Sequence, residues 1–231
     1  MRGLGTAVNV LTVLAGTGAG LVLGNRLTER TRATLLAGVG LITLVIGFDQ
    51  ASATHNVVFP LVAIVLGGLA GERLAIEERL EGLGEVARRR LRTGSDGSST
   101  FVEAFVTASL VFCVGPLTIL GSIQDGLHAD HELLFVKAGL DGLVSIVLAS
   151  TLGWGVAGAA GVVLVYQGGL TLLAGVADDV LTDRMVAELT ATGGIMILGI
   201  GLRLLDVKRV RVASYLPALL VIPVAVALFA R

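Results

Sequence analysis

A pair of opposite charges interrupts one of the long apolar stretches of this sequence. Lys137 and Asp141, in the stretch FVKAGLDGLVS, are four residues apart, so they share one face of a helix and can pair with each other. Charged groups at membrane depth are costly, and each one is therefore a candidate functional group. We expect the pair either to line a pathway for a solute or ion or to join two helices as a structural ion pair.

Four further polar residues lie within apolar stretches or at their ends. Asn9 and Gln167 are neutral, and hydrogen bonding between helices is the common role of such residues in membranes. Glu103 and Glu188 are expected at opposite mouths of the membrane, Glu103 on the cytoplasmic side and Glu188 on the outer side. All four are candidates for a pathway, although the two glutamates also fit simple exposure at the interface.

A proline follows a glycine in the middle of another apolar stretch. Proline lacks a backbone N–H, so Pro116 predicts a kink that leaves the carbonyls near Phe112 and Cys113 without their usual partners. Transporters expose backbone groups to ions at such breaks, whereas neighbouring groups satisfy most simple kinks. The loop expected next, QDGLHADHE, contains Asp125 and has no basic residue. It is expected either to attract cations to the outer mouth or to be merely solvated.

The composition places these residues in a membrane protein. Of the 231 residues, 54% are hydrophobic and 15% are charged, and the mean hydropathy is +0.88, which lies outside the usual range of soluble domains. The 32 glycines are about twice the average usage. Glycine lets membrane helices approach closely, so the composition favours a tightly packed all-α bundle.

Several functional classes find no support in the sequence. The formal net charge of −1 argues against a nucleic-acid partner, which would require a basic surface. The single cysteine and three histidines lack the spacing of a zinc site. No Walker loop, dinucleotide fingerprint, HExxH motif or GxSxG motif occurs. We therefore expect neither an enzyme nor a bound metal or cofactor.

Eight apolar segments are long enough to cross, or nearly cross, a bilayer. They are roughly residues 4–24, 33–48, 57–71, 102–121, 133–150, 154–176, 188–204 and 213–230. The turn at 150–154 separates two of them, and seven spans result if this turn is absent. The first segment is longer than a signal-peptide core, so we expect it to be retained. Eight spans place 13 of the 17 basic residues on one side, which predicts that both termini face outward.

Two parts of the chain resemble each other 154 residues apart. Leu27–Gly47 and Leu181–Gly201 are identical at ten of 21 positions, beginning with LTER in one and LTDR in the other. The match continues with a three-residue shift, as FPLV at 59–62 corresponds to LPAL at 216–219. Span two matches span seven, five spans later, and this odd separation means that the two copies run in opposite directions. This predicts an inverted-topology repeat, in which spans one to three correspond to spans six to eight.

The repeat gives an expected division of the chain. Residues 1–75 form the first repeat, 101–152 form two inserted spans, and 153–231 form the second repeat. The intervening residues 76–100 have apolar residues at helical spacing among Glu and Arg, followed by a Gly- and Ser-rich turn. They predict an amphipathic helix along the cytoplasmic interface and a flexible linker, or a solvated connector without a function.

Four stretches are similar to those of a known bacterial family. They are FVTASLVFCVG at 105–115, KAGLDG at 137–142, AELTATGGIMILGIGL at 187–202 and RVRVASYLPALL at 209–220. Together they resemble the membrane-protein family called domain of unknown function 554, and the resemblance covers nearly the whole chain. It implies a polytopic bacterial inner-membrane protein without a settled activity, so it assigns no site residue.

The sequence thus favours a transporter or channel for a small ion or solute, because inverted repeats are common in such proteins. The alternative is a structural or regulatory membrane protein that moves nothing and binds a partner through the cytoplasmic helix. Besides the lipid bilayer and a small solute, the sequence leaves a homo-oligomer open. It does not identify the solute.

The topology can be tested with reporter fusions. A reporter active only in the cytoplasm should work near Arg90 or Lys208 and fail near His128 or Asp179, because basic loops stay inside. The opposite pattern would overturn the orientation. Fusions at the two ends should both report an outside location, and ends on opposite sides would instead mean an odd number of spans.

Overall fold

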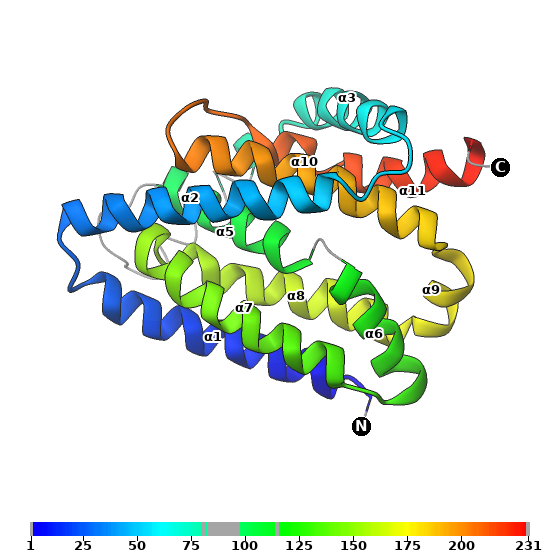
Figure 1. Ribbon diagram of the computed structural model, residues 1–231, viewed down its shortest axis with the longest axis horizontal. Coiled ribbons are helices and arrows are strands. Elements are labelled where there is room, and N and C mark those ends of the chain that lie inside the picture. Colours follow the sequence, from blue (N-terminus) through cyan, green and yellow to red (C-terminus); the bar gives the residue numbers. More distant parts are fainter. Residues whose placement is uncertain (1, 80–81, 83–97, 114–115, 230–231) are drawn as a thin grey trace. The chain divides into compact units, whose positions relative to one another are not determined.

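The computed structural model describes residues 2–79, 82, 98–113 and 116–229. Within these ranges the regular elements are helices and there is no strand, which confirms the all-α class (Figure 1). The helices are α1 (Leu4–Gly24), α2 (Glu29–Ala51), α3 (Val58–Arg73), α5 (Ser98–Cys113), α6 (Pro116–His128), α7 (Glu132–Leu152), α8 (Gly155–Leu172), α9 (Ala174–Val180), α10 (Asp183–Leu204) and α11 (Ala218–Phe229), with a 3-10 turn, η1 (Val212–Tyr215).

The helices have the length and composition of membrane spans. In the described part of the chain, six are long and apolar enough to cross a bilayer, and seven spans result if the bent pair of α5 and α6 counts as one. Helix α3 has 16 residues, fewer than the ~20 that cross a 30 Å hydrocarbon core. The exact number of spans, and with it the eight-span topology, stays a prediction.

The chain forms two compact units that do not follow the order of the sequence. Unit 1 contains Met1–Leu36 and Thr100–Val180, and unit 2 contains Ala37–Ser99 and Leu181–Arg231. Each unit therefore contains residues from both copies of the expected repeat. The units are defined by contacts in space, whereas the copies of the repeat are defined by similarity in sequence. The units therefore do not test the repeat boundaries expected at 75, 100 and 152, which remain predictions.

A row of glycines holds α1 against α7 in unit 1. Gly16 and Gly20 are four residues apart on α1, which is the spacing of small residues at close helix contacts in membranes. A Cβ atom added at Gly16 would lie 2.3 Å from the carbonyl oxygen of Gly142, and one at Gly20 would lie 2.4 Å from that of Ile146. The contacts advance together along both helices, so α1 and α7 are parallel, and they lie side by side in Figure 1.

Two breaks interrupt the helices of unit 1 where the sequence predicted them. Helix α5 ends at Cys113 and α6 begins at Pro116, and the pair is bent by 59°. Between α7 and α8, Gly153 has φ 88 and ψ −160, a conformation that is essentially restricted to glycine. The stretch at 150–154 therefore turns the chain and separates two spans.

Glycine contacts also join α2 to α10 in unit 2. A Cβ atom at Gly201 would lie 2.6 Å from Cδ2 of Leu44, and one at Gly47 would lie 3.0 Å from Cγ of Leu198. Leu44 and Leu198 are equivalent in the repeat register, and so are the two glycines. The same contact therefore occurs twice with the roles of the two helices exchanged.

The second pair of contacts repeats this exchange. Gly40 faces Leu205, and its equivalent Gly194 faces Ala51, which is the equivalent of Leu205. The contacts run in opposite directions along the two helices, so α2 and α10 are antiparallel. Reciprocal contacts of this kind are the signature of a two-fold relation between two surfaces.

The connection between α6 and α7 is shorter than the sequence predicts. The loop expected at 124–132 is wrong over most of its length, because α6 continues to His128 and α7 begins at Glu132. Only three residues join them, and Ala129 turns the chain with a positive φ of 54. The amphipathic helix expected within 76–100 lies largely outside the described residues.

The close approach of α2 and α10 gives a stability test. In Gly194→Ala the new Cβ atom would lie 2.3 Å from the backbone nitrogen of Ala51, so we expect a loss of about 1–3 kcal/mol from overpacking. Gly38 on α2 has nothing within 4 Å of such an atom. Gly38→Ala should be neutral or slightly stabilising, since alanine favours helices by up to about 1 kcal/mol. Unfolding in detergent would compare them, and equal stability would contradict the contact.

Candidate functional site

Unit 1 brings four of the sequence-predicted site residues into one buried cluster. Lys137 and Asp141 lie one turn apart on α7 and form an ion pair. Asn9 on α1 donates from Nδ2 to Oδ2 of Asp141 at 2.9 Å and to Oε1 of Gln167, on α8, at 3.0 Å. The cluster therefore connects α1, α7 and α8 through side chains alone.

The cluster is closed to solvent. Asn9 and Gln167 are 0% exposed, and Lys137 and Asp141 are 4% and 7% exposed. Gln167 donates from Nε2 to the hydroxyl oxygen of Thr6 at 3.1 Å, which extends the network along α1. Thr6 was not among the residues predicted from the sequence, although it lies three residues before Asn9 and therefore on the same helical face.

One acceptor in this network has no donor. Both neighbours of Asn9 Nδ2, the Asp141 carboxylate and Gln167 Oε1, are acceptors, so the amide nitrogen must face them. The amide oxygen Oδ1 of Asn9 is then left buried without a hydrogen-bond partner among the residues that the structure describes. An unsatisfied buried acceptor costs about 1–3 kcal/mol, and such a group can bind a donor or a cation that reaches it.

The break between α5 and α6 lies near this cluster. Cys113 is buried at the end of α5, close enough to Lys137 and Asp141 for both charges to act on its thiol. The carbonyl oxygen of Phe112 accepts a hydrogen bond of 3.0 Å from the Thr118 hydroxyl. This carbonyl, expected to be free because of Pro116, is thus satisfied by the first turn of α6.

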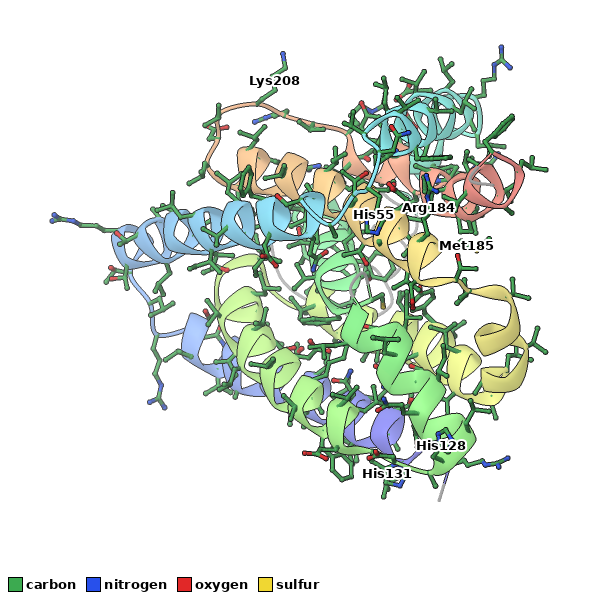
Figure 2. All side chains as sticks on the ribbon, turned by 45° about the vertical axis from the view of Figure 1, so that its right-hand side comes forward. His55, His128, His131, Arg184, Met185 and Lys208 are labelled. Carbon is green, nitrogen blue, oxygen red and sulfur yellow. The ribbon has the colours of Figure 1, made fainter. Side chains whose placement is uncertain are left out.

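Asp125 lies elsewhere in unit 1 and is held within the protein. It is 0% exposed in α6, and its carboxylate accepts from the backbone N–H of Gly3 at 3.1 Å and contacts Nδ1 of His131 at 2.6 Å. Figure 2 shows His131 beside His128 where α6 meets α7. The expectation that Asp125 lies in a solvated outer loop is therefore wrong, and the structure gives it the role of joining the chain start to this end of the unit.

Glu188 is fully buried in unit 2, so simple exposure at the interface does not describe it. Its carboxylate accepts from the Thr54 hydroxyl at 2.6 Å and from the backbone N–H groups of His55 and Asn56 at 2.9 and 3.1 Å. These residues precede α3, so Glu188 satisfies backbone groups at the entrance to that helix.

A second buried glutamate caps the corresponding place in the other copy. Glu77 is 5% exposed, accepts from the backbone N–H of Ala213 at 3.0 Å and contacts Arg203 at 3.3 Å. Ala213 follows Asn56 by 157 residues, which is the register that matches 59–62 to 216–219. Glu77 was not predicted from the sequence, because a glutamate that follows an apolar segment resembles an ordinary charged residue at the membrane interface.

The two remaining candidates, Glu103 and Glu188, lie on helices other than the three that carry the cluster. Glu103 is half-buried on α5, and Glu188 belongs to unit 2. In the described ranges no group of three or more His, Cys, Asp or Glu side chains is placed to hold a metal ion. The buried network of Thr6, Asn9, Lys137, Asp141 and Gln167 is therefore the candidate site, and we call it the polar cluster.

Comparisons with known proteins agree on the class of the molecule. The family described as "Protein of unknown function (DUF554)" matches residues 4–227. The "Uncharacterized membrane protein YdfK" of Bacillus subtilis (strain 168) is 32% identical over 227 residues, covering 96% of this chain and 95% of that protein. The "Uncharacterized protein YqgA" of Escherichia coli (strain K12) is 29% identical over 219 residues, covering 94% and 93%. No solved structure matches the chain.

These matches confirm the resemblance drawn from the four sequence stretches. Together with the apolar helices, they establish a multi-pass membrane protein. Neither relative's name states an activity or a ligand, so the chemistry of the polar cluster has to be argued from its own geometry.

The ion pair in the polar cluster gives a second stability test. Asp141→Leu leaves Lys137 buried without its partner, so we expect a loss of about 3–5 kcal/mol. Adding Lys137→Met should restore most of that loss, because two apolar side chains then replace two charges. Unfolding in detergent measures both, with the exposed Lys208→Met as the control. A double variant no more stable than the single one would show that the pair has no such coupling.

Proposed function

The chain belongs to the DUF554 family, and we propose that it forms a membrane pathway for a small ion or solute. The observation that carries this proposal is the polar cluster, which places an ion pair, two amides and an unpartnered amide oxygen among the helices of unit 1. A purely structural network would be expected to satisfy its own acceptors. Groups of this kind within membrane helices commonly mark substrate or ion pathways.

The cluster can contact a solute through both kinds of hydrogen-bonding group. Asp141 and the free Oδ1 of Asn9 accept hydrogen bonds or bind a cation, whereas Lys137 donates. A cation near Asp141 would compete with Lys137, and an anion near Lys137 would compete with Asp141. Binding of a solute would therefore release one partner of the ion pair.

The helix contacts support an architecture suited to transport. The reciprocal contacts of Gly47 with Leu198 and of Gly201 with Leu44 are those expected for inverted copies. The matching caps on Asn56 and Ala213 support the same relation at the entrances to α3 and α11. We propose that spans one to three and six to eight are related by a pseudo-two-fold axis in the membrane plane.

The protein is proposed to act in the inner membrane with both ends outside, as the distribution of basic residues predicts. Moving a solute in this way needs no catalytic group and no cofactor. Access to the polar cluster requires the surrounding helices to shift, since its two amide side chains are 0% exposed. We propose the junction of α5 and α6, which are bent by 59° to each other, as one place in unit 1 where such a shift occurs.

Reconstituted flux tests the proposal. Protein in liposomes should move at least one member of a panel of ions and small metabolites. Asp141→Asn should lower that flux at least tenfold, because it removes the charge that pairs with Lys137 and holds Asn9. Asp206→Asn makes the same chemical change at an exposed position with a positive φ of 55, which asparagine tolerates, so flux should be unchanged there.

Folding has to be separated from transport in this experiment. Insertion and the unfolding transition of Asp141→Asn would be measured on the same preparation, so that a loss of flux is assigned only to folded protein. Full flux in the double variant Lys137→Met, Asp141→Leu would refute the proposed pathway. Absence of flux across the whole panel for the unaltered protein would favour a protein that moves nothing.

A further inference from the structure

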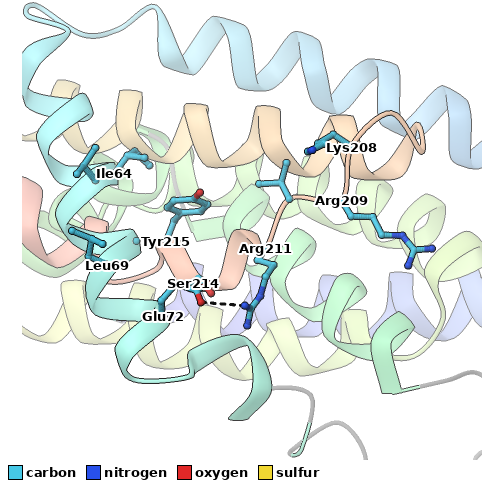
Figure 3. Close-up of a pocket in the computed structure, with 11 residues that line it drawn as sticks. Ile64, Leu69, Glu72, Lys208, Arg209, Arg211, Ser214 and Tyr215 are labelled. Atoms are coloured by element: carbon cyan, nitrogen blue, oxygen red, sulfur yellow. Dashed lines mark hydrogen bonds and ion pairs between the residues drawn. The ribbon is translucent and has the colours of Figure 1, made fainter.

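A groove in unit 2 combines an apolar wall with a basic rim (Figure 3). It has a volume of about 590 Å³. Helix α3 contributes Ile64, Val65 and Leu69 to one side. The opposite side comes from the segment between α10 and η1, which carries Lys208 and Arg209. The groove is separate from the polar cluster, which belongs to unit 1.

The two halves of the groove are held together by a close helix contact. A Cβ atom at Gly68 on α3 would lie 2.8 Å from Cε1 of Tyr215, so only glycine lets the ring lie flat on the helix here. Tyr215 lines the groove beside Ser214, as Figure 3 shows. The groove is therefore part of the packing between α3 and η1 and not a gap beside a loop.

Its positive charges are not all equivalent. Arg211 pairs with Glu72 at 3.1 Å and also with Glu78. A backbone hydrogen bond and the Arg211 guanidinium hold the pKa of the Glu78 carboxyl below its usual value, so this arginine stays neutralised at neutral pH. Lys208 and Arg209 are exposed, and neither has an ion pair with any residue in the described ranges. Figure 2 shows Lys208 projecting away from the ribbon.

A buried hydroxyl also lacks a partner in this groove. Ser214 is 2% exposed and lines the groove, and its Oγ has no hydrogen-bond partner in the described part of the chain. A buried unsatisfied hydroxyl is uncommon, and a missing ligand is one explanation of such a group. Lys208, Arg209 and the Ser214 hydroxyl, which lack side-chain partners in the described ranges, therefore border the same apolar groove.

We propose that this groove binds the head group of an anionic phospholipid, with an acyl chain along α3. The charges suit a phosphodiester: Arg211 offsets one of its two partners, Glu72 and Glu78, and the two charges of Lys208 and Arg209 exceed the single negative charge that remains. The apolar wall suits an acyl chain and not a small dissolved anion. Val65 and Leu69 are 50% and 60% exposed, so the wall continues onto the lipid-facing surface. Basic pockets between membrane helices on the cytoplasmic side bind anionic lipid head groups in other proteins.

Lipid titration of the purified protein tests this site without any transport measurement. Protein in detergent would be titrated with phosphatidylglycerol and with phosphatidylcholine, and the bound lipid would be followed by native mass spectrometry. Phosphatidylglycerol should bind more tightly. The double variant Lys208→Gln, Arg209→Gln should weaken its binding about 30-fold, which corresponds to about 2 kcal/mol for two charges, and should leave phosphatidylcholine unchanged.

A matched control separates this site from general attraction to a basic surface. Arg26→Gln, Arg30→Gln removes two exposed charges from the predicted cytoplasmic loop after the first span, and it should keep tight binding. An equal loss in both double variants would overturn the site, as would equal affinity for the two lipids. Displacement of phosphatidylglycerol by soluble glycerol phosphate would refute the lipid assignment and leave a small-anion site. Both double variants change exposed side chains and should fold normally.

Discussion

Close approach of helix backbones at glycine residues is the constraint on which the rest of this structure depends. At Gly16, Gly20 and Gly194 an added methyl group would lie 2.3–2.4 Å from backbone atoms of the facing helix. Lipid tails are as apolar as leucine side chains, so helices in a bilayer associate through packing and hydrogen bonds instead of a hydrophobic force. Glycine supplies the packing, and it also brings polar side chains on facing helices within bonding distance.

The polar cluster follows from this closeness. Asn9 on α1 reaches Asp141 on α7 because Gly16 and Gly20 let these helices run in contact, and it reaches Gln167 on α8 at the same time. Once buried, each group needs a partner, which explains why five polar side chains gather in one network. The amide oxygen Oδ1 of Asn9, which is buried without a hydrogen-bond partner in the described ranges, is the feature on which the proposed pathway rests.

The buried side chains of Glu188 and Glu77 also need hydrogen-bond partners, and they find them in the backbone. Glu188 accepts hydrogen bonds from the backbone N–H groups of His55 and Asn56, just before α3, and Glu77 accepts one from the backbone N–H of Ala213 in η1. Glu77 also forms an ion pair with Arg203, whereas the three donors to Glu188 are one hydroxyl and two backbone N–H groups. Both glutamates thus bind backbone N–H groups, but they differ in their side-chain partners.

The sequence by itself determined the helical class, the membrane environment, the limits of most helices and the pairing of Lys137 with Asp141. Each of these depends on composition or on spacing within one helix, and local periodicity reports both. It also determined the break at Pro116, since a missing N–H acts wherever the proline lies.

Only the tertiary structure decided which helices meet, because contacts such as that of Asn9 with Gln167 join residues 158 positions apart. The same is true of Asp125, which the sequence placed in a loop, and of Glu77, whose acidic side chain resembles any interfacial charge until its distant partner Ala213 is known. A side chain's type records what it can bond to, whereas its neighbours across the bundle are set by how the glycine faces of separate helices fit together.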